Sequence, residues 1–439
     1  MSDLRLQPVS IWEVNEQLQF DEPLAPDDPR WVDTSDARGE FSFNRLYRML
    51  GVDQKTWELM GAPSKAYVLF CGHRGCGKST ELRRVHERLN QPKIFFSVLL
   101  DATSALDPNN LQYQDVLLAL AKELLEQLPD DIDIDEVHLG KLRSWFDERL
   151  MTHEATREFA AELEAGAEAQ AGIPFLTKLF TKLTTAFRVN STYKEELRTV
   201  VRNHFSEFAD AFNQLIKAVE QACQQRDLGQ RILFLVDGTD RLRGDDADNF
   251  FVCDVHQLQH VSALFVYTAP IHLIHAGADL NQTFTGTFKL PMVKLYTREG
   301  DRNEAGFEAM RTLLYNRAPR ELFDLASTAE FLVEHSGGHP RDLLRLLQYT
   351  FENATGDLFD RKAAERAVDG LATEYRVFLE AGDYALLAHI DQEPEAEHNS
   401  ERVRYLLYNL ALLEYNSFWW RSHPVIRRLQ AYRSKTTHS

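Results

Sequence analysis

Eight consecutive residues, 72–79, have the types and spacing needed to bind a phosphate group. They are Gly72, His73, Arg74, Gly75, Cys76, Gly77, Lys78 and Ser79, and they match the pattern GxxxxGK[ST] at every fixed position. Glycine allows backbone N–H groups to turn inward around a phosphate, because no Cβ blocks the turn. Lys78 places a positive charge against the β- and γ-phosphates, and the hydroxyl of Ser79 is a ligand for Mg²⁺. This segment, with Thr80 after it, predicts a site for a nucleoside triphosphate and Mg²⁺, and we expect ATP.

A second candidate group is the carboxylate at the end of another apolar segment. Residues 232–237 (ILFLVD) read as a buried strand that ends in Asp237. A carboxylate in that place, beside the phosphate-binding loop, holds Mg²⁺ through water. Gly238, Thr239 and Asp240 follow, so no glutamate comes directly after Asp237. We interpret Asp240 as a general base or water-orienting group, the alternative being a cap on the next turn.

Two more side chains are candidates for contact with the γ-phosphate. Thr268 ends the apolar segment 262–268 (SALFVYT), where its hydroxyl can reach the γ-phosphate or the attacking water. A hydroxyl bonded to the local backbone is an equal alternative. Arg341 follows residues 337–340 (GGHP), in which glycine ends one helix and proline opens the next. Arg341 would then lie on the first turn of a lid helix, and a plain helix–helix corner is the alternative.

Bringing these groups together requires a parallel sheet. Five apolar segments have the length and composition of strands: 66–71, 93–100, 231–237, 262–268 and 291–295. Helical segments separate the first four of these strands. Because strands that alternate with helices form parallel sheets, we predict an α/β fold with a doubly wound parallel sheet of the P-loop NTPase type.

A helical insertion is predicted at about residues 130–190. Five apolar residues in its second half share one helical stripe: Leu176, Leu179, Phe180, Leu183 and Phe187. This stripe favours a helical hairpin packed on its own domain over a helix that binds a partner or touches a membrane. A single long helix is then predicted from Thr192, where Glu195 completes the capping-box pattern.

The length of the chain exceeds the usual limit of one core, so we expect several domains. The predicted division is an N-terminal arm with a short helix (1–60), a P-loop NTPase core (61–300), a helical lid (301–374) and a winged-helix-like domain (375–439). The last assignment depends on the order of elements, which is helices followed by a hairpin of aromatic strands.

The composition is typical of a soluble protein, with 44% hydrophobic and 26% charged residues. No apolar run approaches the ~18 residues that a membrane span needs. The first residues lack the basic-then-apolar layout of a secretory signal. The four cysteines show no CxxC spacing and read as reduced thiols. We therefore expect a cytoplasmic protein without a membrane span.

The net charge of -18 argues against a protein that coats nucleic acid, because its average field repels phosphate. The C-terminal region is nevertheless basic. Its cationic residues after Glu401 are Arg402, Arg404, Arg421, Arg427, Arg428, Arg433 and Lys435. This region permits contact with DNA, and a solvated helix face is the alternative interpretation.

Three segments together resemble a known group: 69–82 (LFCGHRGCGKSTEL), 235–242 (LVDGTDRL) and 336–347 (SGGHPRDLLRLL). They resemble the STAND and Cdc6/Orc-like branches of the AAA+/ASCE P-loop ATPases, over roughly residues 60–435. The GGxPR corner is similar to the sensor-2 lid of Orc-like ATPases and to the GxP motif of STAND proteins. The resemblance implies a nucleotide-driven switch with slow turnover that controls a partner protein or its own assembly. Many bacterial relatives of this kind serve in signalling or anti-phage defence.

The alternative that this resemblance leaves open is a DNA-engaging ATPase or loader that uses the winged helix. The sequence departs from the family in its arginines. The stretch directly before residues 291–295, residues 276–290 (AGADLNQTFTGTFKL), contains no arginine where AAA+ proteins place a finger that acts on a neighbouring subunit. The strand that ends in YTAP also lacks a terminal arginine. Arg241, Arg298 and Arg302 are substitutes that the sequence does not rank.

Overall fold

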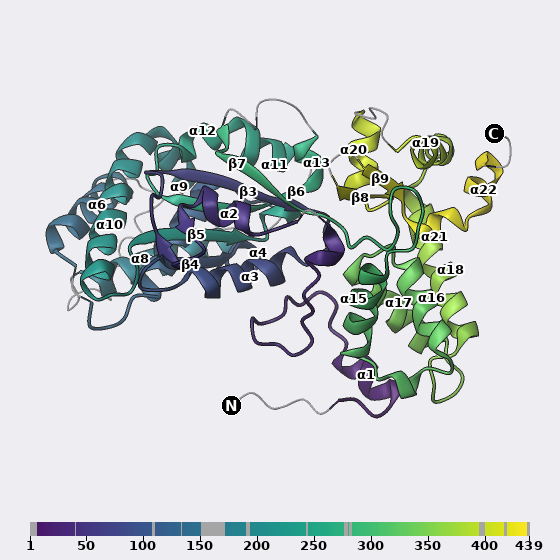
Figure 1. Ribbon diagram of the computed structural model, residues 1–439. Helices are drawn as coiled ribbons and strands as arrows, with labels where there is room; N and C mark the ends of the chain where they lie inside the picture. The colour runs from purple at the N-terminus through teal and green to yellow at the C-terminus, as the bar shows by residue number, and fades with distance from the viewer. Residues whose placement is uncertain are drawn as a thin grey trace.

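A computed structural model describes residues 7–39, 41–107, 110–132, 134–150, 172–189, 194–242, 245–275, 280, 283–394, 400–416 and 419–436. Figure 1 shows an α/β core beside a second lobe that contains the helices α15 to α22. The purple N-terminal segment runs between the two, and its helix α1 (Ile11–Gln17) packs against the second lobe.

The core is built around a five-stranded parallel sheet of order β4-β5-β6-β3-β7. Its strands are β3 (Ala66–Gly72), β4 (Phe95–Asp101), β5 (Arg231–Asp237), β6 (Leu264–Pro270) and β7 (Gly286–Leu290). Every residue of β3 and β6 is buried, as expected for apolar strands covered on both faces. The predicted parallel α/β fold of the P-loop NTPase type is therefore confirmed.

The prediction of the last strand was wrong in position. The strand is β7 (Gly286–Leu290), and residues 291–295 lie beyond it. Pro291 has no N–H to donate to a sheet. The next amides have other acceptors: Met292 N–H donates to the carbonyl of Glu414 (3.0 Å), and Lys294 N–H donates to that of Ala37 (2.9 Å). This segment therefore joins the core to two distant parts of the chain.

Helices cover the sheet and form the insertion. The longer ones are α3 (Lys78–Leu89), α5 (Tyr113–Glu126), α6 (Glu136–Leu150), α8 (Ile173–Arg188), α9 (Lys194–Asn203) and α10 (Phe205–Gln225). The apolar stripe of α8 is buried, and α8 packs against α5 and α6. This confirms that the stripe packs on its own body. Shorter elements are α2 (Asn44–Met49), β1 (Val52–Asp53), β2 (Glu58–Leu59), α4 (Ala102–Ala105), α11 (Asp245–Asp248), α12 (Val255–Leu258) and α13 (Ile271–Ile274).

The long helix predicted from Thr192 is interrupted. Thr192 itself lies outside the described residues, and His204 separates α9 from α10. The two halves make different main contacts, although both touch α6. Arg198 of α9 donates to Asp115 of α5 (Nε–Oδ1, 2.9 Å), whereas α10 packs on α6 and β5. The bend lets each half reach its own contact, so one continuous helix was the wrong prediction.

The second lobe is helical, with one hairpin. Its elements are α15 (Glu304–Tyr315), α16 (Ala326–His335), α17 (Pro340–Asn353), α18 (Arg361–Phe378), α19 (Ala381–Gln392), α20 (Glu401–Tyr408), β8 (Leu412–Asn416), β9 (Trp419–Ser422), α21 (Pro424–Arg427) and α22 (Gln430–Thr436). We call α15 to α18 the lid, and β8 with β9 the C-terminal hairpin. Helix α18 continues through residue 374, where the lid was predicted to end. The winged-helix assignment stays a prediction.

None of the helices in the described ranges has the length and apolar character needed to span a bilayer.

Candidate nucleotide-binding site

Residues 72–79, here called the P-loop, connect β3 to α3 at the carboxyl edge of the sheet. Gly75 (φ 86°) and Gly77 (φ 104°) have backbone conformations that other residues rarely adopt. A Cβ on Gly75 would also lie only 2.8 Å from the Cβ of Arg341. The loop leads directly into the N-terminus of α3, where backbone N–H groups and the helix dipole favour an anion.

Lys78 lies under the P-loop with its side chain 3% exposed. Its ammonium group donates to the carbonyls of Gly72 and His73, both at 2.9 Å, and pairs with Oδ2 of Asp240 at 2.7 Å. Burial favours the neutral forms of both partners, but their mutual attraction outweighs it. The pKa of Lys78 is therefore raised and the pKa of Asp240 is lowered, so this pair is ionised.

Ser79 and Asp237 meet at the same place. The Ser79 hydroxyl donates to Oδ1 of Asp237 at 3.0 Å, and Gly238 N–H donates to the same oxygen at 2.8 Å. Burial raises the pKa of Asp237, and the nearby charges of Asp240 and Asp101 add to this effect. Asp101 was not singled out from the sequence. It lies at the end of β4, in register with Asp237 on β5.

This geometry fits a triphosphate with Mg²⁺. A hydroxyl and a carboxylate within hydrogen-bond distance are oxygen ligands of the kind Mg²⁺ prefers, and Mg²⁺ takes its remaining ligands from water and phosphate. The described residues hold no group of three or more His, Cys, Asp or Glu side chains placed to bind a metal ion by themselves. The P-loop cradle and Lys78 supply the complementary phosphate contacts.

Thr268 is fully buried and lies before the end of its strand, because β6 continues to Pro270. Its hydroxyl donates to the carbonyl of Val236 on β5 (3.4 Å), and its carbonyl accepts from the hydroxyl of Thr239. In this structure Thr268 therefore makes the backbone contact that was its alternative. A contact with the γ-phosphate stays a prediction.

Arg341 lies on the first turn of α17, as predicted, and directly against the P-loop. Its N–H donates to the carbonyl of Gly75 (3.4 Å), and its guanidinium pairs with Asp21 (2.9 Å). Its Nε is buried without a hydrogen-bond partner in the described part of the chain. Beside it, Nε2 of His339 donates to the carbonyl of Arg74 (2.8 Å). The lid thus contacts two successive P-loop residues.

Asp342, the next residue of α17, links the lid to the C-terminal hairpin. It is fully buried, accepts from the hydroxyl of Tyr375 (2.8 Å) and pairs with Arg345 (3.2 Å). Nε2 of His423, which follows β9, lies 3.1 Å from its carboxylate. Burial opposes the charge, but the surrounding donors, with His339 first, hold the pKa of Asp342 well below its ordinary value.

The C-terminal hairpin also contacts the P-loop. The backbone N–H of Glu414 in β8 donates to Nε2 of His73 (2.8 Å). Burial lowers the pKa of His73 to about 3, so the imidazole is neutral and can accept this bond. The carboxylate of Glu414 is fully buried, accepts from Nε2 of His275 (2.8 Å) and pairs with Lys289 of β7. These contacts hold the hairpin against both the sheet and the P-loop.

The N-terminal arm, residues 7–39, is a part of the site that the sequence interpretation missed. Arg38 is buried, and its guanidinium donates to the carbonyl of Cys76 (2.8 Å) and to that of Pro291. Leu24 N–H donates to the hydroxyl of Thr80 (3.1 Å). A cavity of about 110 Å³ lies between the arm, the P-loop and the lid. These contacts join residues far apart in sequence, so no local pattern signals them.

The three substitute arginines separate in space. Arg241 directly follows Asp240 in the chain. Its positive charge adds to that of Lys78 in lowering the pKa of Asp240. Arg298 lies over the ring of Trp419 (5.6 Å), and Arg302 pairs with Glu304 and Glu330 on the lid.

Comparison with known proteins gives matches at the level of structure. No family model matches the chain, and no curated protein matches it in sequence. Solved structures that it resembles include the Walker-type ATPase PABY2304 of Pyrococcus abyssi, at 13% identity and TM-score 0.42, covering 94% of this chain and 99% of that one. The RuvB Holliday junction branch migration motor of Thermotoga maritima matches at 11% identity and TM-score 0.37, covering 92% and 96%.

The Orc1 protein of Aeropyrum pernix, solved in complex with DNA, matches at 13% identity and TM-score 0.38, covering 98% and 97%. At these identities and scores the likenesses add no argument about function.

Proposed function

We propose that the chain binds ATP with Mg²⁺, hydrolyses it slowly, and uses the bound nucleotide to control a partner protein or its own assembly. One observation carries this proposal: the loop that brings Lys78, Ser79 and Asp237 together is also contacted by the lid and the C-terminal hairpin. A site that only retained a nucleotide would not need both the lid and the C-terminal hairpin on its phosphate loop.

Each residue has a defined part in the proposed reaction. Lys78 and the P-loop amides bind the phosphates, and Ser79 and Asp237 hold Mg²⁺, which supplies positive charge to the phosphate oxygens. Asp240, which pairs with Lys78 in this structure, is proposed to orient water or accept its proton. A lowered pKa makes a carboxylate a weak base at neutral pH, because efficient bases have a pKa close to the working pH. This property of the structure supports the proposed slow turnover.

The switch is proposed to act through contacts that bear on the P-loop. His73 contacts the hairpin, Arg74 and Gly75 contact the lid, and the carbonyl of Cys76 holds Arg38 of the N-terminal arm. Because four successive loop residues touch three different parts of the chain, a shift of the loop on nucleotide binding changes all three contacts. Arg341, whose buried Nε has no partner among the residues that the structure describes, is the lid group proposed to sense the γ-phosphate.

The first test compares nucleotide binding and phosphate release in the wild type and in Lys78→Ala. We expect Mg²⁺-dependent ATP binding that Lys78→Ala abolishes and that the exposed control Lys55→Ala retains. Wild-type protein that does not bind ATP, or Lys78→Ala that binds it equally well, would refute the proposed site.

The second test addresses the switch. Hydrogen exchange in the hairpin and lid, and the mass in solution, are measured with and without ATP. We expect ATP to change hydrogen exchange in both the lid and the hairpin. His73→Ala should bind ATP while the response of the hairpin is lost. Equal exchange with and without ATP at saturating occupancy would leave a nucleotide-binding protein but exclude the proposed coupling.

The alternative function, a DNA-engaging ATPase, would use the basic C-terminal region. Arg427 pairs there with Asp391 (3.3 Å) and Arg428 with Asp369 (3.0 Å), so carboxylates offset part of the charge offered to phosphate. The structure therefore favours the protein switch. Duplex DNA binding as a function of salt tests the alternative: in the double variant Arg427→Glu/Arg428→Glu, a loader would bind more weakly and with a flatter salt slope.

A further inference from the structure

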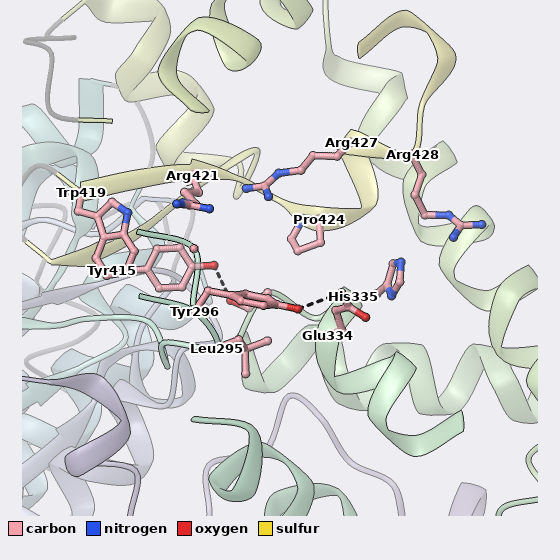
Figure 2. A pocket seen from close by; sticks show the side chains of 12 residues that line it. Leu295, Tyr296, Glu334, His335, Tyr415, Trp419, Arg421, Pro424, Arg427 and Arg428 are labelled. Atoms are coloured by element: carbon pink, nitrogen blue, oxygen red, sulfur yellow. Dashed lines mark hydrogen bonds between the residues drawn. The ribbon is translucent and has the colours of Figure 1, made fainter. Parts of the chain in front are cut away.

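A second cavity lies away from the P-loop, where the lid and the C-terminal hairpin meet. Its volume is about 400 Å³, within the range of small-molecule sites. Its walls come from the segment after β7 (Leu295, Tyr296, Gly300), the end of α16 (Glu334, His335), and the hairpin with α21. Figure 2 shows these walls with their side chains.

The hairpin side of this cavity carries positive charge, offset in part where Arg427 pairs with Asp391 and Arg428 pairs with Asp369. Arg421, Arg427 and Arg428 line it, and Glu334 is the one carboxylate among the lining residues that the structure describes. The Oε1 of Glu334 accepts from the hydroxyl of Tyr296 (3.0 Å) on the opposite wall. Figure 2 shows the guanidinium groups of Arg421 and Arg427 directed toward one another, with Tyr296 and Tyr415 below them.

Three buried N–H groups at this wall have no acceptor in the described part of the chain. They are Nε of Arg421, Nε of Arg427 and Nε1 of Trp419, and Trp419 as a whole is 3% exposed. Arg421 forms no ion pair within the described ranges, and its terminal nitrogen donates to the backbone carbonyl of Arg298 (2.9 Å). Buried donors in folded proteins almost always have acceptors. The described residues therefore leave donor capacity unused at this wall.

Aromatic rings add a second recognition element. Tyr415 and Trp419 lie with ring centroids 5.2 Å apart, and the hydroxyl of Tyr415 donates to the carbonyl of Gly337 (2.8 Å). The Tyr415 hydroxyl is thus already satisfied, and its ring forms part of the wall. Guanidinium groups match phosphate geometry, and flat aromatic walls match a nucleobase.

We infer that this cavity, the arginine pocket (Tyr296, Tyr415, Trp419, Arg421, Arg427), binds a small phosphate-bearing ligand of nucleotide size. The ligand would bridge α16 of the lid and the C-terminal hairpin. This ligand is distinct from the triphosphate bound by the P-loop. Its binding does not depend on whether the P-loop hydrolyses ATP. A ligand bound there would stabilise the contact between the two parts of the second lobe.

The test uses the full chain with Lys78→Ala, which removes binding at the P-loop, and follows tryptophan fluorescence and heat of binding. The probes are AMP, ADP and inorganic pyrophosphate, with adenosine and citrate as compounds that lack phosphate. We expect saturable one-to-one binding of at least one phosphate probe and none of adenosine or citrate. Arg421→Glu should weaken binding at least about tenfold, because a hydrogen bond to a charged group is worth that much. The control Arg376→Glu, at an exposed position of α18, should bind like its parent.

Trp419→Phe tests whether the fluorescence change comes from the pocket. We expect this variant to lose the fluorescence change and to keep the heat of binding, which places the probe beside Trp419. The same titrations in the wild type, where the P-loop adds a second site, cover the case in which Lys78→Ala does not fold. No binding of any phosphate probe, equal binding by Arg421→Glu, or equal binding of citrate would overturn the inference. Binding of duplex DNA alone, lost in Arg421→Glu, would also overturn it, because the pocket would then be part of a nucleic-acid surface.

Discussion

The ion pair between Lys78 and Asp240 gives the sharpest prediction, because it opposes nucleotide binding while it stabilises the free protein. The two charged atoms are 2.7 Å apart, and the side chains are 3% and 12% exposed. At an effective dielectric constant of 20 their Coulomb attraction is about 6 kcal/mol before desolvation. Removing one member of a buried pair costs about 3–5 kcal/mol, because the other charge is left without compensation.

Asp240→Asn should therefore lower the stability of the nucleotide-free protein by up to that amount. It should also strengthen ATP binding. Lys78 no longer has a competing carboxylate, and one negative charge beside the phosphates is removed. We expect about tenfold or more in affinity, the value of one charged hydrogen bond. Hydrolysis in a single turnover should fall by about 10²- to 10⁴-fold if Asp240 orients or deprotonates water.

Three assays separate these effects: urea denaturation without nucleotide, binding of a fluorescent ATP analogue, and release of labelled phosphate in a single turnover. The matched control is Asp246→Asn, at an exposed position on α11. Weaker or unchanged ATP binding by Asp240→Asn would refute the competition argument. Unchanged hydrolysis by Asp240→Asn would show that Asp240 only pairs with Lys78 and takes no part in the reaction.

Three more predictions concern the contacts around the P-loop. Arg38 donates to the carbonyl of Cys76, so Arg38→Gln should weaken binding of the fluorescent ATP analogue about tenfold. The control Arg48→Gln, at an exposed position, should bind like the wild type. Equal affinities of Arg38→Gln and the wild type would exclude the arm from the site. Asp342→Asn should lower the free energy of unfolding, measured in urea, by about 3–5 kcal/mol, because Asp342 bonds Tyr375 and Arg345 in the interior. The control Asp357→Asn, at an exposed position, should leave it unchanged. Similar unfolding midpoints of Asp342→Asn and the wild type would contradict a stabilising role of these buried contacts. Burial opposes the charge of Glu414, but His275 and Lys289 keep its folded pKa below the ordinary 4.5, so its stabilisation is complete above pH 4.5 and is lost as pH falls through the folded pKa. Glu414→Gln should therefore flatten the acid side of the stability curve, and an unchanged acid profile would show that the carboxylate contributes nothing.

Local patterns predicted much of the core correctly. The strands β3 and β5 and the helix α3 lie where apolar runs and glycine punctuation placed them. The position of β7 was wrong because residues 286–290 contain glycine, threonine and lysine, and their strand conformation comes from pairing with β3. The interruption at His204 was also missed because it depends on tertiary contacts. Helix α9 contacts α5, whereas α10 packs mainly on α6 and β5.

The sequence alone determined the phosphate loop, since its glycines, lysine and serine act through backbone geometry and charge that are local to eight residues. It also placed Asp237 at a strand end. Only the tertiary structure decided that Asp237 meets Ser79, that Asp240 turns to Lys78, and that Arg38, Arg341 and Glu414 converge on the loop. Those contacts depend on the order of strands and on the packing of three distant segments. Burial and the charges of neighbouring groups together then set the charge state of each group, and no local pattern encodes surroundings that other parts of the chain provide.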